Sequence, residues 1–395
     1  MLRKVETGDP ANIDAVRITA LDRARTMITL LVVVHHSAVN YTHFGSGDRM
    51  RWLGFDLVVL FNDSFFMACM FLISGLFVHD SLARRGVTDY LRHRAWRLGI
   101  PFLISIFVLM PVAYYPTFLR YHLPGTTDFN FLHFWWRTLT VGPWPSGPAW
   151  FLWVLLALDI VAAAVWALAP RTLKLFGLWI FSLRGRPWTA LATFLAFSAA
   201  IYLPMRLLFG EASWLEPGGY PLPIQTSRIL LYAGYFLSGV GIGVVSLRAG
   251  ILSEEGELAR RWPVWLAIAS SFYGAILLLV YAHHNWIADF NSPPLSWQAL
   301  YGLAFALFSA AMTFVVLSVF LAFAASRIKL LDAMRPQAYG IFLTHYIFII
   351  WLQYAVYDYA WPAFVKFAIV FAGTLTLSWA ATALLRKIPV VARTI

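Results

Sequence analysis

The sequence has one cysteine, Cys69, and few charged residues. A single cysteine excludes an internal disulfide, so the fold does not depend on oxidation. Aspartate, glutamate, lysine and arginine make up 12% of the chain, about half the share in a typical soluble domain. There is no HExxH, P-loop, GxGxxG or GxSxG pattern, and His283 and His284 lack the partner spacing of a metal site. We therefore expect no metal and no tightly bound cofactor.

What the chain does contain is a series of long apolar runs. Hydrophobic residues fill 60% of its 395 positions, and 18 residues are tryptophan. Each run has about 20 residues, the length that a helix needs to cross the hydrocarbon core of a bilayer. The pattern predicts an all-α polytopic membrane protein with about ten transmembrane helices, forming a single domain over residues 1–395. The expected spans are 18–42, 55–79, 97–119, 148–169, 188–209, 226–248, 263–284, 298–324, 336–357 and 362–385, between tails at 1–17 and 386–395.

Basic residues are distributed unequally between the two sides of such a bundle. All but seven of the 30 lysines and arginines fall in the two tails and in the loops on the same side as the tails. The seven exceptions are Arg49, Arg51, Arg120, Arg137, Arg206, Arg228 and Lys366. The positive-inside rule makes the basic side cytoplasmic, so we expect both termini in the cytoplasm. Membrane topology thus accounts for the net charge of +11, and we expect no nucleic-acid partner.

The first span carries a stripe of polar side chains. In LDRARTMITLLVVVHHSAVNYT, residues 21–42, Arg25 and His36 lie within about 20° of the same helix face and about 16 Å apart along it. Ionisable residues inside a membrane usually mark a functional site, and histidine is the usual general base near neutral pH. An arginine at the mouth suits a phosphorylated cosubstrate such as coenzyme A. Alternatively, Arg25 anchors the helix at the surface and His36 packs against a backbone carbonyl.

Polar and small residues in the first two spans extend this candidate site. Asn40 lies one turn beyond His36, and Asp63 lies in the outer half of the second span, so either could orient the imidazole. Asp63 could instead cap a helix or bond to a neighbouring one. Ser74 and Gly75 lie lower in the same span, where small residues admit a slender ligand or another helix.

Four further residues are candidates for ligand binding. Arg94 and Arg97 are three positions apart, so we expect them on one helical face, where they suit a pyrophosphate or anchor the chain to anionic lipid. Trp150 belongs to a tryptophan-rich outer segment that suits either sugar rings or the membrane interface. His345 lies near mid-membrane in the ninth span, as a partner of the site or as a core histidine.

Five short motifs, in order along residues 18–357, resemble those of the bacterial membrane-bound acyltransferase family 3. The first helix carries the pattern L-D-x-x-R followed by ten residues and a histidine, which matches the family's first-helix signature, with Thr26 where the family usually has glycine. MACMFLISGLFV resembles its M-x-x-F-F-x-x-S-G segment, LRHRAWRLGIPFL its R-x-x-R-x-x-x-P segment, GPAWFLWVLLALD its W-F-L segment, and YGIFLTHYIFI its Y-x-x-H segment. LFND and YPLPIQTSRILLYAGYFLSGVGIGVVSLRAGIL are similar to the glucans biosynthesis protein C-like branch.

The resemblance implies a membrane O-acyltransferase in a bacterial inner membrane. For this branch it implies transfer of a succinyl group from cytoplasmic succinyl-CoA to hydroxyls of an osmoregulated periplasmic glucan. His36 would act as the general base that removes the hydroxyl proton, with its ring oriented by a second residue, as in a catalytic triad. The residues expected to bind are Arg25, Ser74, Gly75, Arg94 and Arg97 for coenzyme A, Trp150 and His345 for the acceptor, and Arg206 for the succinyl carboxylate, which needs a cation when buried.

Other functions remain open from the sequence. An O-acetyltransferase that uses acetyl-CoA on another envelope polysaccharide would employ the same residues, and His36 could carry the acyl group as a covalent intermediate. A transporter or flippase would use the polar stripe as a conduction path. The lack of clear repeats or paired broken helices counts against transport.

Overall fold

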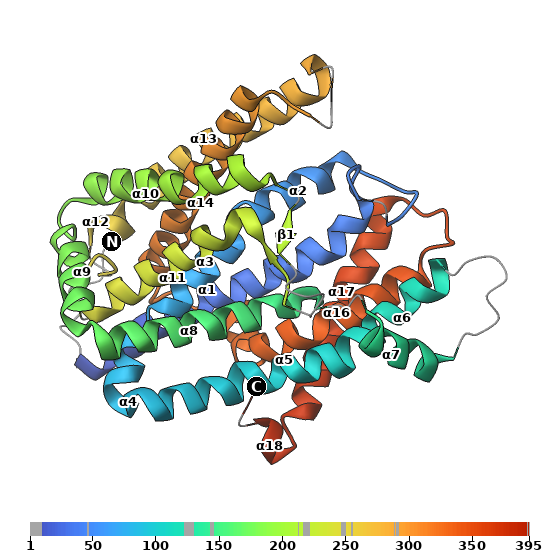
Figure 1. Ribbon diagram of the computed structural model, residues 1–395, viewed down its shortest axis with the longest axis horizontal. Helices are drawn as coiled ribbons and strands as arrows, with labels where there is room; N and C mark the ends of the chain where they lie inside the picture. Colours follow the sequence, from blue (N-terminus) through green and yellow to red (C-terminus); the bar gives the residue numbers. More distant parts are fainter. Residues whose placement is uncertain are drawn as a thin grey trace.

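The computed structural model describes residues 10–392 and Thr394, except residues 46, 122–129, 143–145, 212, 216–221, 246–249, 254–255, 288, 290–291 and 393. The described chain is almost entirely helical (Figure 1). The elements of its first half are α1 (Pro10–Ala38), η1 (Val39–Tyr41), α2 (Leu53–Asp63), α3 (Phe66–Gly75), α4 (Val78–Arg94), η2 (Ala95–Gly99), α5 (Ile100–Ile104), η3 (Ser105–Leu109), α6 (Met110–Tyr121), α7 (Phe131–Thr140), η4 (Gly147–Ala149), α8 (Trp150–Leu168), α9 (Pro170–Ser182) and α10 (Pro187–Phe209). Those of its second half are β1 (Trp214–Leu215), β2 (Ile224–Gln225), η6 (Thr226–Arg228), α11 (Ile229–Val244), α12 (Glu257–Arg260), α13 (Trp262–Trp286), α14 (Leu295–Ala322), α15 (Lys329–Met334), η7 (Arg335–Gln337), α16 (Ala338–Ala355), α17 (Ala363–Leu385) and α18 (Pro389–Ala392). Strands β1 and β2 pair antiparallel, with Trp214 opposite Gln225.

Nine helical segments of the described chain are long and apolar enough to cross a membrane. They are Leu53–Gly75, Val78–Tyr121, Gly147–Leu168, Pro187–Phe209, Thr226–Val244, Trp262–Trp286, Leu295–Ala322, Lys329–Ala355 and Ala363–Leu385. These correspond to the second to tenth predicted spans. The first predicted span falls on α1, which is not among them because Asp22, Arg23 and Arg25 interrupt its apolar stretch. The prediction of an all-α polytopic membrane protein is confirmed, with α1 as an additional, more polar helix.

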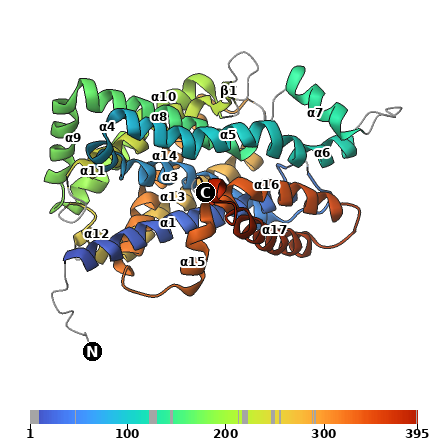
Figure 2. The ribbon, with the colours of Figure 1, turned by 90° about the horizontal axis from the view of Figure 1, so that it is seen from below.

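Helix α1 lies inside the bundle. It packs against α2, α3, α14, α16 and α17, and Figure 2 shows it running from the N-terminal end towards the middle of the molecule. None of its residues from Thr19 to Ala38 is fully exposed, and many are buried. This is the setting in which polar residues within a membrane are expected.

Two of the predicted spans depart from regular α-helix. The second is broken at Ser64 and Phe65, between α2 and α3, where Phe65 has φ −145° and ψ −31°. The third lies in the helical segment from Val78 to Tyr121, which is kinked at Gly86, where φ is 73° and ψ is 170°, and includes two π-helical turns, η2 and η3. Breaks and π turns in helices are frequent at functional sites, and both of these lie close to candidate site residues.

Helices α3 and α11 approach each other closely through glycines. A Cβ on Gly75 would lie 2.1 Å from the carbonyl oxygen of Phe236, and one on Gly239 would lie 2.0 Å from that of Leu72. Gly243 approaches the carbonyl of Leu76 in the same way, at 2.3 Å. Small residues spaced along one face let helix backbones come into contact inside a membrane. This contact fixes the position of α3, which borders the candidate site.

Candidate functional site

Aromatic rings from α1 and α16 meet in the interior of the bundle. The ring centroid of His36 on α1 lies 5.3 Å from that of His345 and 5.4 Å from that of Tyr346, both on α16. His345 is fully buried, whereas His36 keeps part of its surface accessible. We call His36, His345 and Tyr346 the central cluster. The structure thus brings together the two histidines that the sequence placed at similar depth.

Backbone carbonyls determine which nitrogen of each histidine carries the proton. Nδ1 of His36 lies 3.0 Å from the carbonyl oxygen of Val32, and Nδ1 of His345 lies 2.6 Å from that of Phe342. A carbonyl only accepts, so in a neutral ring Nδ1 donates and Nε2 carries the lone pair. Nε2 of His345 is buried without a partner, and Nε2 of His36 has no partner among the described residues. His36 therefore presents a proton acceptor on an accessible ring, as a general base requires.

Gln353 of α16 fixes the backbone of α1 beside the imidazole. Its amide nitrogen donates to the carbonyls of His36, at 3.2 Å, and Ser37, at 3.5 Å, and its oxygen accepts from Nδ2 of Asn40 at 2.5 Å. Since α1 ends at Ala38, its last carbonyls lack intrahelical partners, and Gln353 supplies one. Asn40 thus acts on the backbone near His36 through Gln353, and the carbonyl of Val32 holds the ring itself.

Asp63 lies at the break between α2 and α3 and is paired with Arg228. The guanidinium donates to Oδ1 of Asp63 at 2.9 Å, to Oδ2 at 2.5 Å and to its backbone carbonyl at 3.1 Å. These bonds satisfy the carboxylate and cap the C-terminal end of α2. The Arg228 side chain is only 4% exposed, but that of Asp63 is 38% exposed, so the carboxylate faces an accessible space. Its charge acts on the neighbouring ring of His35, and it is not bonded to His36.

The three arginines predicted to bind coenzyme A lie near one another. Arg94 and Arg97 are close enough for their charges to act on Arg25. Arg25 donates to the carbonyl of Ile73 at 3.2 Å and lies over the ring of Phe77, and its side chain is 34% exposed. Its position on the same helix as His36 and its accessibility suit contact with a phosphate.

Arg94 and Arg97 turn to different neighbours. Nε of Arg94 lies 3.1 Å from Oδ2 of the buried Asp159 on α8 and 3.2 Å from the hydroxyl of Tyr90. Arg97 is exposed and lies over the ring of Tyr339 on α16. Their prediction on one face assumed regular α-helix, but a π turn begins directly after Arg94. Within the described chain, Arg97 has no carboxylate partner, which leaves its charge available for a ligand.

Ser74 and Gly75 take part in helix packing. The hydroxyl of Ser74 donates to the carbonyl of Met70 one turn earlier, at 2.8 Å, and Gly75 lies against the backbone of α11. The group that reaches Arg25 is the carbonyl of the preceding residue, Ile73. These two residues therefore place α3 beside Arg25, and a direct contact with coenzyme A remains a proposal.

Trp150 and Arg206 lie in other surroundings. Trp150 stacks on Tyr232 of α11, with ring centroids 5.4 Å apart. Arg206 is 4% exposed and donates to Oε2 of Glu211 at 2.9 Å, while its Nε is buried without a partner. In the described part of the chain, no hydrogen bond, ion pair or ring contact joins either residue to the central cluster. Nor do the described residues include a group of three or more histidine, cysteine, aspartate or glutamate side chains that could hold a metal ion.

The sequence analysis did not single out Arg228, Gln353, Tyr346 or the buried pair of Lys366 and Asp48. The Lys366 ammonium donates to Oδ1 and Oδ2 of Asp48, at 3.1 and 2.8 Å, and to the carbonyl of Tyr357 at 3.0 Å. A signal for two of these was present, because Arg228 and Lys366 are exceptions to the positive-inside pattern. A basic residue on the wrong side of a membrane needs a local reason, and here that reason is a carboxylate partner, Asp63 for Arg228 and Asp48 for Lys366.

Comparison with known proteins gives the family of the chain. The model of a family described as "Acyltransferase domain" matches residues 18–383, which include every residue of the central cluster and the three arginines. No curated protein and no solved structure matches significantly. Since the family match covers nearly the whole chain, the protein belongs to the acyltransferase 3 family of membrane acyltransferases.

Proposed function

We propose that this protein is an acyl-CoA-dependent O-acyltransferase of a bacterial inner membrane that transfers a succinyl group to hydroxyls of a periplasmic glucan. The acyltransferase class follows from the family. The succinyl donor and the glucan acceptor rest on the resemblance of the sequence to one branch of it. The distribution of basic residues supports a topology with both termini in the cytoplasm.

One observation carries the proposed catalytic role of His36. Its Nδ1 donates to Val32, so the lone pair lies on Nε2 of a ring that is accessible and sits on the same helix as Arg25. In this proposal the phosphates of coenzyme A bind near Arg25 and Arg97, and the pantetheine arm extends along α1 towards His36. The acceptor approaches from the other end of α1, where Asn40 lies.

The chemical step needs only one base. Nε2 of His36 removes the proton of a sugar hydroxyl as the oxygen attacks the thioester carbonyl carbon. The new C–O ester bond forms, the C–S bond breaks, and the coenzyme A thiolate takes the proton back from the imidazolium. The carbonyl of Val32 stabilises the protonated ring through Nδ1–H, the part that a carboxylate plays in a triad. In the covalent variant, Nε2 attacks the thioester carbonyl carbon and the C–S bond breaks to release the coenzyme A thiolate. The sugar hydroxyl then attacks the acyl-imidazolium, gives its proton to the thiolate, and displaces the neutral imidazole.

The decisive experiment follows label from donor to polysaccharide. Purified protein in proteoliposomes receives succinyl-CoA or acetyl-CoA, labelled in the acyl group, on one face and a β-glucan on the other. We expect succinyl ester in the glucan. Acetyl transfer alone would assign an O-acetyltransferase, and saturable glucan movement without acylation would assign transport and overturn the proposal.

Variants of the two histidines test the assignment of the base. We expect His36→Ala to lower turnover by about 10²–10⁴-fold, the usual contribution of a general base, with an unchanged elution profile. His345→Ala, a change to the neighbouring ring, is the matched control and should retain more activity. Near-normal turnover of His36→Ala would remove His36 from the mechanism.

A further inference from the structure

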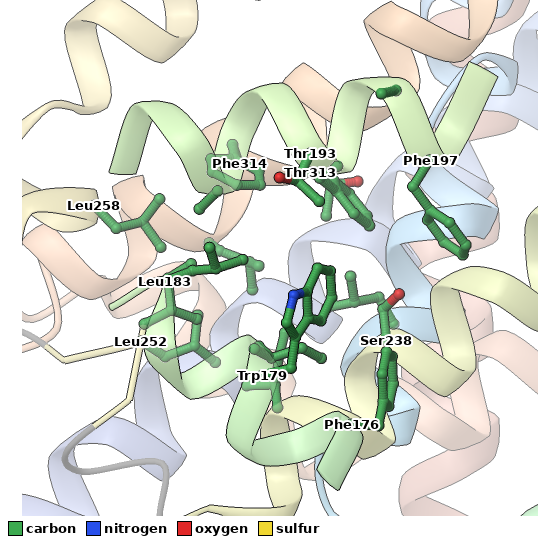
Figure 3. Close-up of a pocket in the computed structure, with 18 of the residues that line it drawn as sticks. Phe176, Trp179, Leu183, Thr193, Phe197, Ser238, Leu252, Leu258, Thr313 and Phe314 are labelled. Carbon is green, nitrogen blue, oxygen red and sulfur yellow. The ribbon is translucent and has the colours of Figure 1, made fainter. Parts of the chain in front are cut away.

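A cavity lies away from the central cluster, on the other side of α3. It has a volume of about 480 Å³ and is lined by α9, α10, α11, α14 and the segment around Leu252 and Leu258 (Figure 3). Leu72 of α3 lines it, whereas the carbonyl of the next residue, Ile73, accepts from Arg25. One helix therefore separates this cavity from the proposed coenzyme site.

The cavity is suited to hydrocarbon and not to water or a polar ligand. Its lining is almost wholly apolar, with Thr193, Ser238 and Thr313 as exceptions. The Ser238 hydroxyl donates to the carbonyl of Gly234, and that of Thr313 to the carbonyl of Ser309, both at 2.8 Å. Hydroxyls bonded to their own helices offer little to a water molecule, and apolar cavities of this kind stay dry.

The cavity opens sideways between α9 and α10. Trp179 on α9 lines it and is 51% exposed, and the lining residues Ala196 and Ala200 on α10 are also exposed. Figure 1 shows α9 running across the ends of α8 and α10, which it joins, roughly at right angles to both. Leu175 and Leu178 of this helix are exposed as well. A short helix with exposed apolar side chains, lying across the end of a bundle, is typical of the membrane interface.

Three exposed arginines lie next to lining residues along the chain. Arg184 and Arg186 follow the lining residue Leu183, and Arg260 follows the lining residue Leu258. All three arginines are exposed, and none forms a salt bridge with a described residue. Basic clusters beside a membrane surface attract anionic lipid headgroups, at about 1 kcal/mol for each basic residue.

We propose that this cavity binds an acyl chain of an anionic membrane phospholipid, which enters between α9 and α10 and places its headgroup at Arg184, Arg186 and Arg260. The inference does not depend on the acyl group or acceptor assigned above. It has a consequence for the site, because a chain against Leu72 supports α3 from the side opposite Arg25.

Native mass spectrometry of the full-length protein tests the site. Delipidated protein is titrated with phosphatidylglycerol, or with phosphatidylcholine of the same chains, and bound lipid is counted. Ala196→Trp fills the cavity, and Ala192→Trp places the same side chain on an exposed position of α10 outside the lining. We expect Ala196→Trp to weaken phosphatidylglycerol binding at least about tenfold relative to Ala192→Trp, since each methylene group excluded removes apolar burial.

Two further arms identify the ligand. The triple variant Arg184→Gln, Arg186→Gln, Arg260→Gln should lose most of the preference for phosphatidylglycerol over phosphatidylcholine. Lipid with brominated chains should quench the fluorescence of the wild-type protein more than that of Trp179→Phe. Equal binding by the two tryptophan variants, equal binding of the two lipids by the wild type, or retention of a long-chain acyl-CoA in place of phospholipid would each overturn the proposal.

Discussion

The buried pair of Lys366 and Asp48 is expected to support the region around His36. Lys366 lies on α17 and is 1% exposed, and the Asp48 side chain, in the segment before α2, is 3% exposed. Each of the three ammonium protons has an acceptor, two on Asp48 and one at Tyr357. The backbone nitrogen of Asp48 donates to the carbonyl of Asn40 at 3.0 Å. The pair therefore holds the segment that contains Asn40, which is bonded to Gln353 beside His36.

Replacing Lys366 by methionine should destabilise the protein strongly. The change leaves a buried carboxylate without its counter-charge, and removal of one partner from such a pair costs about 3–5 kcal/mol. Replacement of both partners, as in Lys366→Met with Asp48→Leu, removes both charges and should recover most of that loss, because a well-packed apolar pair can equal a buried ion pair. The expected order of stability is wild type, then the double variant, then Lys366→Met.

The assay is unfolding of purified protein in mixed micelles, followed by near-ultraviolet circular dichroism and combined with acyl transfer. Lys174→Met is the control, because Lys174 is exposed on α9 and should change little. The double variant should remain less active than the wild type even where its stability recovers, because the Asp48 carboxylate also accepts from the backbone nitrogen of Met50, at 2.8 Å, and leucine cannot replace this contact. A free energy of unfolding for Lys366→Met within about 1 kcal/mol of the wild-type value would refute the reasoning, since it would mean that the pair is not desolvated as the structure indicates.

Three other changes have defined outcomes. Gly239→Ala should lower the free energy of unfolding by at least about 1–3 kcal/mol, because the new Cβ would lie 2.0 Å from the Leu72 carbonyl oxygen. The control is Gly274→Ala on α13, where a Cβ would have nothing within 4 Å, and this change should be neutral or stabilising in the same assay. Arg97→Gln should raise KM for acyl-CoA about tenfold, the effect of one charge-assisted contact, and leave kcat nearly unchanged; a loss in kcat alone would contradict a role in binding. Gln353→Leu leaves the carbonyls of His36 and Ser37 without the side-chain donor, at a cost to stability of about 1–3 kcal/mol. It should lower kcat more than Trp351→Leu, a change at an exposed residue of the same helix. Equal effects of the two changes on kcat would exclude a role of Gln353 in positioning His36.

The sequence predicted the main features because they depend on composition and helical period. Apolar runs of membrane-spanning length appear as nine of the ten predicted spans, and the eleven-residue interval from Arg25 to His36 placed both on α1. The partners of these residues could not be predicted. The pairing of His36 with His345 joins helices 309 positions apart, and it depends on how α1 packs against α16.

Local departures from helix geometry account for other differences. A regular helix was assumed for Arg94 and Arg97, and no residue pattern signalled the π turn that begins after Arg94 and contains Arg97. Asp63 was considered as a partner of the imidazole, but the break after α2 turns its carboxylate and carbonyl towards Arg228. Gly75 was considered for ligand binding, and the same absence of a side chain instead serves contact with α11. In each case the residue type was informative, whereas its role depended on a backbone that only the structure describes.

The two π turns in the helix that follows the kink at Gly86 and ends at Tyr121 have a consequence for homologous sequences. A π turn is an α-helical turn with one residue inserted, so deleting a single residue within Ala95–Gly99 or Ser105–Leu109 would restore regular helix without breaking the chain. Everything beyond the deletion would then rotate by about 100° relative to what precedes it. Homologues that differ in length in this helix are therefore expected to differ by one residue at these turns. In such homologues, the angle about the helix axis between Arg94 and the residues after the turn should differ from the angle in this protein.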